Sequence, residues 1–277
     1  MKRNIVFFLS TGRVGTQWFV NTFRNYYKDL VNAEHEPLAH RYRPVDFYRN
    51  YKKTDQMLDD EEIKTHLGSI NDVIKKGKLH YIETGWPAYA FIPLLCKIYP
   101  ERLKVIHIVR NPVEVALSLS THNIRDSNHP YSKAAMLNPK HSRAKIRGKY
   151  KARWNHLTQY EQNLYQWTEI NSYGVELERI FPMVKFLLVK KEDILGSNSS
   201  KEFINLMNFL ELPVRSKPLS LLAKPYDKYS KQSNQITDVR LIYSYKQTIK
   251  LAKKFGYDSD TLIHKDYITE RYISKNE

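Results

Sequence analysis

The stretch IVFFLSTGRVGTQW, residues 5–18, decides the fold class. Its first five residues predict a buried β-strand, because they are rich in Val, Ile and Phe and are followed by polar residues. Gly12 and Gly15 then predict a tight turn, and a helical pattern begins at Thr16. Backbone N–H groups of such a turn, with a helix N-terminus behind them, attract anions. The stretch therefore predicts a strand, a turn and a helix that together can hold a phosphate or a sulfate.

The same alternation of strand and helix continues along the chain. Four more apolar runs predict strands, at residues 30–33, 79–82, 105–109 and 184–189. Helical patterns occur at residues 16–27, 61–76, 88–99, 112–119 and 160–180. Such alternation is typical of an α/β fold, here a three-layer parallel sheet with flanking helices. In these sheets ligands bind at the carboxyl ends of the strands.

Composition excludes several classes of protein. The chain has 277 residues, and 42% of them are hydrophobic, which is too many for a disordered chain. Cys96 is the only cysteine, which excludes a disulfide scaffold and a cysteine-based zinc module. No apolar run approaches the ~18 residues of a membrane-spanning helix, and no signal peptide is visible. We therefore expect a soluble, cytoplasmic protein.

The charge of the chain is large and unevenly spread. Lys and Arg number 45 against 29 Asp and Glu, a net charge of +16 that suits nucleic acid, an anionic membrane surface, small anions or only a solvated surface. No acidic residue occurs from Ser127 to Tyr160. We expect a single domain over residues 1–277, with a basic insertion at about 122–160 and a helical C-terminal extension from about residue 214.

A second anion-binding motif follows the fourth predicted strand. Arg110 comes at the end of that strand, and Asn111 and Pro112 are typical of the N-cap and the first position of a helix. Arg110 is therefore expected at the carboxyl edge of the sheet, with Ser118 two turns into the helix. An arginine and a serine so placed can hold a dianionic phosphate. The alternative is an arginine in a structural ion pair.

Together the two motifs resemble those of the PAPS-dependent sulfotransferases, and most closely those of the carbohydrate-type enzymes. That family carries a loop for the 5′-phosphosulfate after its first strand and an R-[ND]-P-x-x-x-x-x-S element for the 3′-phosphate. Residues 11–18 (TGRVGTQW) and 110–118 (RNPVEVALS) match these elements, and residues 189–194 (VKKEDI) are similar to a segment after the family's last strand. The resemblance implies a P-loop NTPase-like sulfotransferase fold, PAPS as the sulfuryl donor, PAP as its product and no metal in the chemistry.

The resemblance also implies roles for particular residues. The 5′-phosphosulfate would be held by Gly12, Arg13, Val14, Gly15, Thr16 and Gln17, with Trp18 near the adenine, and the 3′-phosphate by Arg110 and Ser118. Arg13 stands where many members have a lysine. It keeps the positive charge, but on a planar guanidinium rather than on a compact ammonium group. An R-K-G-x-x-G loop is absent, so we expect Lys224, Lys228, Ser230 or Lys231 to complete the cofactor site.

Sulfuryl transfer to an alcohol needs a base for the hydroxyl proton, and cations that meet the charge on the leaving phosphate oxygen. Arg13 suits the second task. For the first, residues 34–40 (EHEPLAH) include an E-P-L-x-H segment that resembles one in the Golgi carbohydrate sulfotransferases, whose glutamate is taken as the base. We therefore predict Glu36 as the base in an in-line attack and Glu34 as the second candidate. Along a strand the two side chains would point the same way.

A third candidate for the base is Glu83, at the end of the third predicted strand. The cytosolic sulfotransferases carry their catalytic histidine in a K-T-H-x-P segment, and residues 83–87 (ETGWP) occupy the corresponding place. Gly85 stands where the histidine would be, so a histidine mechanism does not carry over to this chain. Glu83 could then act as base or orient the acceptor.

The acceptor is expected to be a hydroxyl on a carbohydrate or a glycolipid. The E-P-L-x-H match favours this class, as do Tyr131, Tyr150 and Trp154, which lie between the cations of the basic span. A phenol, a small alcohol or a peptide tyrosine stays open. A kinase on the same fold would need a Lys-[Ser/Thr] pair after Gly15, and a nucleic-acid-binding protein would leave both motifs unexplained. We therefore expect no nucleic-acid partner.

Overall fold

The computed structural model of this chain describes residues 3–77, 80–195, 199–221, 237–258, 262–264, 268 and 272. The chain divides into two compact units. The first consists of Met1–Val109 and Gly174–Tyr226, and the second of Arg110–Tyr173 and Asp227–Glu277. The expected single domain stays a prediction. The whole of the expected basic insertion, at about 122–160, lies within the second unit.

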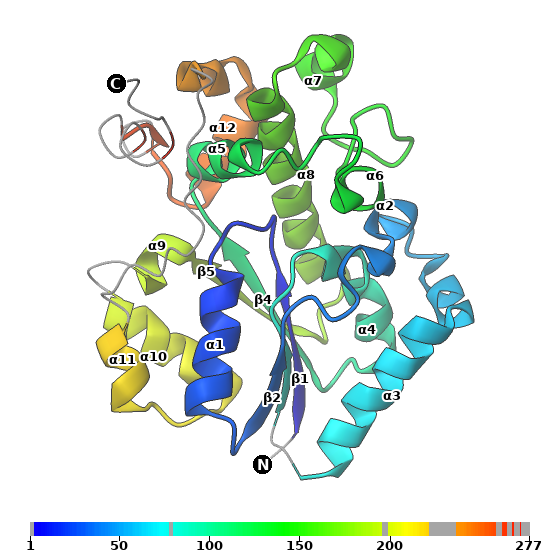
Figure 1. Cartoon of the computed structure of the whole chain (residues 1–277), viewed down its shortest axis with the longest axis vertical. Helices are drawn as coiled ribbons and strands as arrows, with labels where there is room; N and C mark the ends of the chain where they lie inside the picture. Colours follow the sequence, from blue (N-terminus) through cyan, green and yellow to red (C-terminus); the bar gives the residue numbers. More distant parts are fainter. Residues whose placement is uncertain are drawn as a thin grey trace. The chain divides into compact units, whose positions relative to one another are not determined.

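A five-stranded sheet with all its strands parallel forms the centre of the first unit (Figure 1). Its spatial order is β2-β3-β1-β4-β5. The strands are β1 (Asn4–Leu9), β2 (Val31–Glu34), β3 (His80–Glu83), β4 (Leu103–Val109) and β5 (Lys185–Lys190). Every residue of β1, β3 and β4 is buried, as expected for central strands covered on both faces. The five apolar runs of the sequence therefore predicted the five strands to within two residues at each end.

Helices cover both faces of this sheet, so the first unit has the expected three layers. Figure 1 shows α1, α10 and α11 on one face, and α3 and α4 on the other. The helices are α1 (Thr16–Tyr26), α2 (Pro44–Phe47), α3 (Glu61–Lys75), α4 (Ile92–Ile98), α9 (Lys191–Ile194), α10 (Ser199–Leu210) and α11 (Ser216–Leu221). Three 3₁₀ turns join them: η1 (Ala39–Tyr42), η2 (Thr54–Asp59) and η3 (Pro87–Ala90).

The predicted helix over residues 88–99 is two elements, η3 and α4. Pro93 lies in the first turn of α4 and has no N–H to donate to the preceding turn, so one continuous α-helix cannot form there. The neighbouring helix α3 begins as expected. The side chain of Asp60 caps it by accepting hydrogen bonds from the N–H groups of Glu62 and Ile63.

The second unit is mostly helical among its described residues. Its elements are α5 (Pro112–Thr121), α6 (Pro130–Ala135), α7 (Gly148–Arg153), η4 (Trp154–His156), η5 (Val239–Ser244) and α12 (Lys246–Lys254), together with the first part of α8 (Gln159–Ile180), which continues into the first unit. Within the expected helical C-terminal extension, η5 and α12 are separated at Tyr245, whose backbone is not helical (φ −114°, ψ 79°) and whose ring stacks on Tyr150. No helix of the described residues is long and apolar enough to cross a membrane.

One face of α8 holds the basic segment of the second unit in place. Asn163, Gln166 and Glu169 lie three residues apart and therefore share a helix face. Asn163 Oδ1 accepts from Arg125 Nε at 2.9 Å, and Gln166 Oε1 accepts from the N–H of Leu137 at 2.7 Å. The carboxylate of Glu169 accepts from the N–H groups of residues 145 and 146, at 3.1 and 2.8 Å. The carboxylate of Glu169 thus binds backbone N–H groups of this acid-free segment.

Candidate functional site

The loop after β1 has the backbone of an anion-binding turn. Gly12, Arg13 and Gly15 have positive φ angles of 77°, 58° and 89°. The hydroxyl of Ser10 accepts a hydrogen bond from the N–H of Gly12 at 3.2 Å, which fixes the start of the turn. Gly15 is the N-cap of α1, and no side chain caps this helix. The first turn of α1 is therefore open to an anion, and its N–H groups carry the positive end of the helix dipole.

The surroundings of the loop leave no room for side chains at its glycines. A Cβ on Gly12 would lie 3.2 Å from the ring of Trp86, and one on Gly15 would lie 3.1 Å from Leu195 Cδ1. The same Cβ on Gly15 would lie 4.0 Å from Lys191 Cε. The start of α9 thus brings a lysine beside the loop, in addition to Arg13.

The other residues predicted to bind the donor differ in how they can contribute. Arg13 and Gln17 are half-buried, whereas Val14 and Thr16 are buried. Val14 therefore offers its backbone alone. Trp18 is 5% exposed and packs edge-on against Phe203, with ring centroids 6.1 Å apart. Its contact with the adenine remains a prediction.

Two candidate bases lie where β2 ends, beside the residues that follow β3. The strand stops at Glu34, and Glu36 has a φ of 50°, so the expectation that the two side chains lie on one strand and point the same way was wrong. The left-handed residue turns the chain toward Gly85, where a Cβ would lie 2.6 Å from Glu36 Cγ. His35 Nδ1 lies 3.1 Å from the carbonyl oxygen of Thr84. Gly85, which stands where the cytosolic enzymes have a histidine, thus makes room for Glu36.

Glu83 lies inside the first unit. Its carboxylate is 0% exposed and is contacted by three side chains. Oε1 accepts from Tyr42 Oη at 2.7 Å, while Oε2 lies 3.1 Å from His66 Nε2 and 3.2 Å from Tyr81 Oη. Burial raises the pKa of the Glu83 carboxyl, and the hydrogen bond from His66 opposes this. Such a carboxylate can act on an acceptor only through its neighbours.

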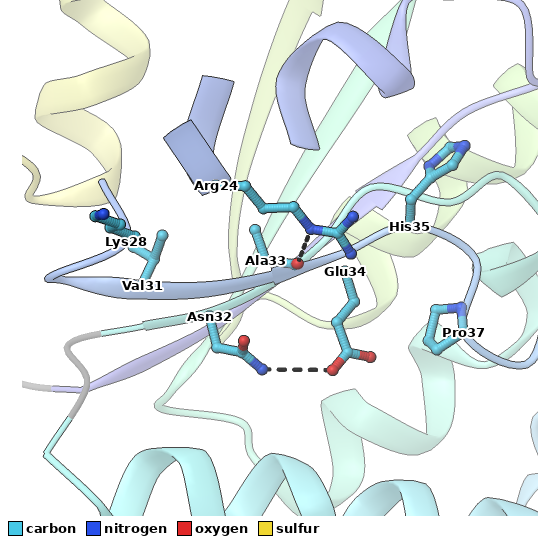
Figure 2. Close-up of a pocket in the computed structure, with 8 residues that line it drawn as sticks. All are labelled: Arg24, Lys28, Val31, Asn32, Ala33, Glu34, His35 and Pro37. Carbon is cyan, nitrogen blue, oxygen red and sulfur yellow. Dashed lines mark hydrogen bonds between the residues drawn. The ribbon is translucent and has the colours of Figure 1, made fainter. Parts of the chain in front are cut away.

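A cavity of about 400 Å³ runs along β2 (Figure 2). Arg24 lies on one side of the strand and donates from Nε to the carbonyl oxygen of Ala33 at 2.8 Å. On the other side, Asn32 Nδ2 donates to Glu34 Oε1 at 3.4 Å. The cavity is lined by Arg24, Lys28, Val31, Asn32, Ala33, Glu34, His35 and Pro37. It therefore offers cations, an amide, an imidazole and a carboxylate to a polar ligand.

In the second unit, Arg110 is held by an acidic side chain. Its guanidinium pairs with Glu114, with Nε 3.0 Å from Oε2, and donates from Nη2 to Tyr272 Oη at 2.8 Å. Asn111 caps α5 as predicted, accepting from the N–H groups of residues 113 and 114. Ser118 is 4% exposed and lies one turn beyond Glu114 on the same face of α5. Arg110 and Ser118 thus lie on either side of the Glu114 carboxylate. A phosphate that binds Arg110 would have to displace this carboxylate or share the guanidinium with it.

The aromatic side chains of the basic segment do not form the expected surface. Tyr150 is 2% exposed and stacks on Tyr245 at 4.1 Å, and Trp154 is 8% exposed and packs edge-on against Tyr165 at 5.3 Å. The prediction that these two rings are platforms for a sugar was therefore wrong, because they form the core of the second unit. Tyr131 is half-buried. Lys224, Lys228, Ser230 and Lys231, predicted to complete the donor site, lie outside the described residues.

Comparison with solved structures identifies the fold of this chain. No model of a protein family and no curated protein sequence matches the chain. Among solved structures, a sulfotransferase domain from the curacin biosynthetic pathway has a TM-score of 0.52 at 14% identity, over 92% of this chain and 98% of its own. A sulfotransferase from Alicyclobacillus acidocaldarius has a TM-score of 0.50 at 15% identity, over 95% of this chain and 99% of its own. The chain has the sulfotransferase fold. This confirms the fold that the two motifs implied.

Within the sulfotransferase fold, three groups near the predicted residues had been missed by sequence reasoning. Lys191 reaches the loop from α9, Glu114 pairs with Arg110, and Tyr81 connects Glu34 to Glu83. Only Glu114 carried a signal, since it lies four residues after Arg110. The other two contacts arise from the packing of separate elements. Among the described residues, no group of three His, Cys, Asp or Glu side chains is placed to hold a metal ion.

Proposed function

We propose that this protein transfers a sulfuryl group from PAPS to a hydroxyl of an acceptor molecule. The main support for this proposal is the loop after β1. It has two glycines with positive φ angles in close contact with their surroundings, it leads into a helix N-terminus that no side chain caps, and Arg13 and Lys191 lie beside it. This combination suits a dianionic group such as a phosphosulfate. The acceptor oxygen forms a bond to sulfur while the bond from sulfur to the phosphate oxygen breaks. The hydroxyl proton passes to a carboxylate.

The family resemblance assigns one part of the donor to each of the two motifs. Residues 12–17 and Lys191 hold the 5′-phosphosulfate, and Arg13 also meets the charge that grows on the leaving phosphate oxygen. Arg110 and Ser118 hold the 3′-phosphate, for which Arg110 exchanges or shares its contact with Glu114. Trp18 lies toward the adenine. The support is charge, hydroxyl chemistry and the match of residues 110–118 to the family element.

Glu36 is our first candidate for the base. It follows β2 at the same sheet edge as the loop, because β1 and β3 are adjacent, and Trp86, which contacts Gly12, directly follows the Gly85 that Glu36 packs against. Glu34 is the second candidate. Glu83 acts through neighbouring groups.

The acceptor is proposed to be a carbohydrate or a glycolipid that carries acidic groups. Six exposed cations of the basic segment form no ion pair with another described residue: Lys133, Lys140, Arg147, Lys149, Lys151 and Arg153. Cations without counterions are available to an anionic chain, and their contribution falls as salt rises. With Tyr150 and Trp154 buried, charge rather than ring stacking supports this choice.

The experiment that tests the function is the transfer of labelled sulfate from PAPS to a panel of acceptors. The panel contains neutral and anionic glycans, glycolipids, phenols and a tyrosine peptide, with ATP and magnesium replacing PAPS as the control for a kinase. We expect label on an anionic glycan or glycolipid, and an initial rate that falls as salt rises. Transfer only to a neutral phenol would contradict the acceptor class, and transfer to nothing would contradict the function.

Replacing Arg110 by Ala is expected to weaken the binding of PAP about 10–100-fold, because charge-assisted hydrogen bonds to a phosphate contribute about 1.5–3 kcal/mol. The affinity for AMP, which has no 3′-phosphate, should stay within about twofold. Isothermal titration calorimetry with both nucleotides measures this. An equal loss for PAP and AMP would instead mean that Arg110 serves only the packing of the second unit.

A further inference from the structure

A chain of hydrogen-bonding groups connects two cavities of the first unit. It begins at Glu34, which lines the cavity along β2. Tyr81 Oη lies 3.1 Å from Glu34 Oε2 and 3.2 Å from Glu83 Oε2. Glu83 Oε2 in turn lies 3.1 Å from His66 Nε2. His66 lines a second cavity, of about 370 Å³, beside α3. Each step is thus within the distance over which a proton can pass along a hydrogen bond.

The middle of this chain is closed to water. Tyr81 and Glu83 are 0% exposed and His66 is 6% exposed. Burial raises the pKa of the Glu83 carboxyl and raises that of Tyr81 well above its usual value. A buried carboxyl with a raised pKa takes up a proton more readily than an exposed one, so Glu83 can receive a proton from one side and release it on the other.

Counting protons favours exchange within the chain. The hydroxyl of Tyr81 has a single proton, yet two carboxylates lie within hydrogen-bond distance of its oxygen. All contacts are satisfied only if one carboxyl is protonated and donates to Tyr81 while Tyr81 donates to the other. The two arrangements differ by moving two protons along the same bonds. The protonation of Glu83 is therefore expected to depend, through Tyr81, on the charge at position 34.

We propose that Glu34, Tyr81, Glu83 and His66 form a proton path that carries the proton released by each turnover from the carboxyl end of β2 to the cavity beside α3. The role of this path depends on the proposed function, because sulfuryl transfer to a hydroxyl releases one proton per turnover. Glu36 releases the proton to water, and Glu34 takes one up from water in the first cavity. Glu34 then donates a proton to Tyr81 as Tyr81 donates its own to Glu83. Glu83 passes a proton to His66, and the imidazolium loses one to water in the second cavity. Every group receives one proton and gives one up.

Other charged groups face the two ends of the path. Arg24, Lys28 and His35 line the first cavity, and Arg41, Glu61 and Glu62 line the second. Tyr42 faces Glu83 and His66 from η1, but it is a side branch. Its hydroxyl bridges Glu83 and His66, which also contact each other directly, so the path does not need it. Tyr81 and Tyr42 are thus two buried tyrosines on Glu83, one inside the path and one outside it, and Tyr42→Phe is the matched control for Tyr81→Phe.

The coupling can be measured without any enzymatic activity. Infrared spectra of the whole chain, compared with Glu83→Gln, identify the carbonyl stretch of the protonated Glu83 carboxyl, and a pH titration gives its midpoint. We expect Glu34→Gln to shift the midpoint of the Glu83 titration in the otherwise native chain and in the Tyr42→Phe background. In the Tyr81→Phe background, the shift that Glu34→Gln causes should be smaller by about half or more. Equal shifts in the two tyrosine backgrounds, or no titrating Glu83 band, would overturn the path.

A second measurement tests its use. With PAPS and an acceptor, the first turnover of Tyr81→Phe should transfer sulfate within about twofold of the native rate, while its steady-state rate should fall about tenfold and recover in a concentrated small buffer. Tyr42→Phe should keep both rates within about twofold. Equal steady-state rates for the two variants would refute the purpose of the path. A native chain that transfers no sulfate would instead refute the proposed function, and the infrared titration would still decide the coupling.

Discussion

Replacing Glu36 by Gln is expected to lower the rate of sulfuryl transfer by about 10²–10⁴-fold, the usual contribution of a general base, and to leave the affinity for PAP within about threefold. Glutamine keeps the size of the side chain, so the packing of Glu36 against Gly85 is preserved. What disappears is the ability to accept a proton. Pre-steady-state measurement of the first turnover, together with calorimetry of PAP binding, separates the chemical step from binding.

Two further variants complete this prediction. Glu34→Gln should slow steady-state turnover while sparing the first turnover, because Glu34 carries the proton away rather than removing it from the acceptor. Glu178→Gln, which removes an exposed carboxylate on α8, should change neither rate. If Glu36→Gln lost only severalfold in its first turnover and Glu34→Gln lost far more, the two carboxylates would exchange roles.

The parts of the fold that local sequence dictates were predictable. Strands β1, β4 and β5 are short runs rich in Val, Ile, Leu and Phe. Helix α5 begins directly after Asn111 because an asparagine followed by proline both caps a helix and fixes its first turn. The loop after β1 was predictable for the same reason, since glycine is the residue that adopts its positive φ angles without strain. Local chemistry alone is thus enough to locate the loop that we propose binds the donor.

The parts that depend on contacts between separate elements were not predictable. Nothing near Glu36 in the sequence signals a left-handed φ, and its packing against Gly85 joins residues that are far apart in the chain. Lys191 meets the loop only because α9 follows the strand beside β4. The buried state of Tyr150 and Trp154 did carry a signal, because they lie four residues apart and so share one helix face. Their position among lysines obscured it.

The second large effect is expected at Gly15. Gly15→Ala should weaken PAP binding by about tenfold or more and reduce transfer accordingly, because the new Cβ would lie 3.1 Å from Leu195 Cδ1 and displace either the loop or the segment that carries Lys191. The methyl group also stands in a backbone with a φ of 89°, which costs a non-glycine residue about 1–2 kcal/mol. Calorimetry with PAP and a thermal unfolding curve measure the two effects separately.

Gly77 supplies the matched control for this prediction. It follows α3 with a φ of 95°, and a Cβ there would meet no atom within 4 Å. Gly77→Ala therefore carries similar backbone strain without a collision, and should lower the melting temperature no more than Gly15→Ala does while leaving PAP binding unchanged. Because the strain is common to both variants, any difference in PAP affinity belongs to the loop and its contacts. Unchanged PAP binding in Gly15→Ala would mean that the donor does not bind at this loop, and the assignment of the 5′-phosphosulfate would fail with it.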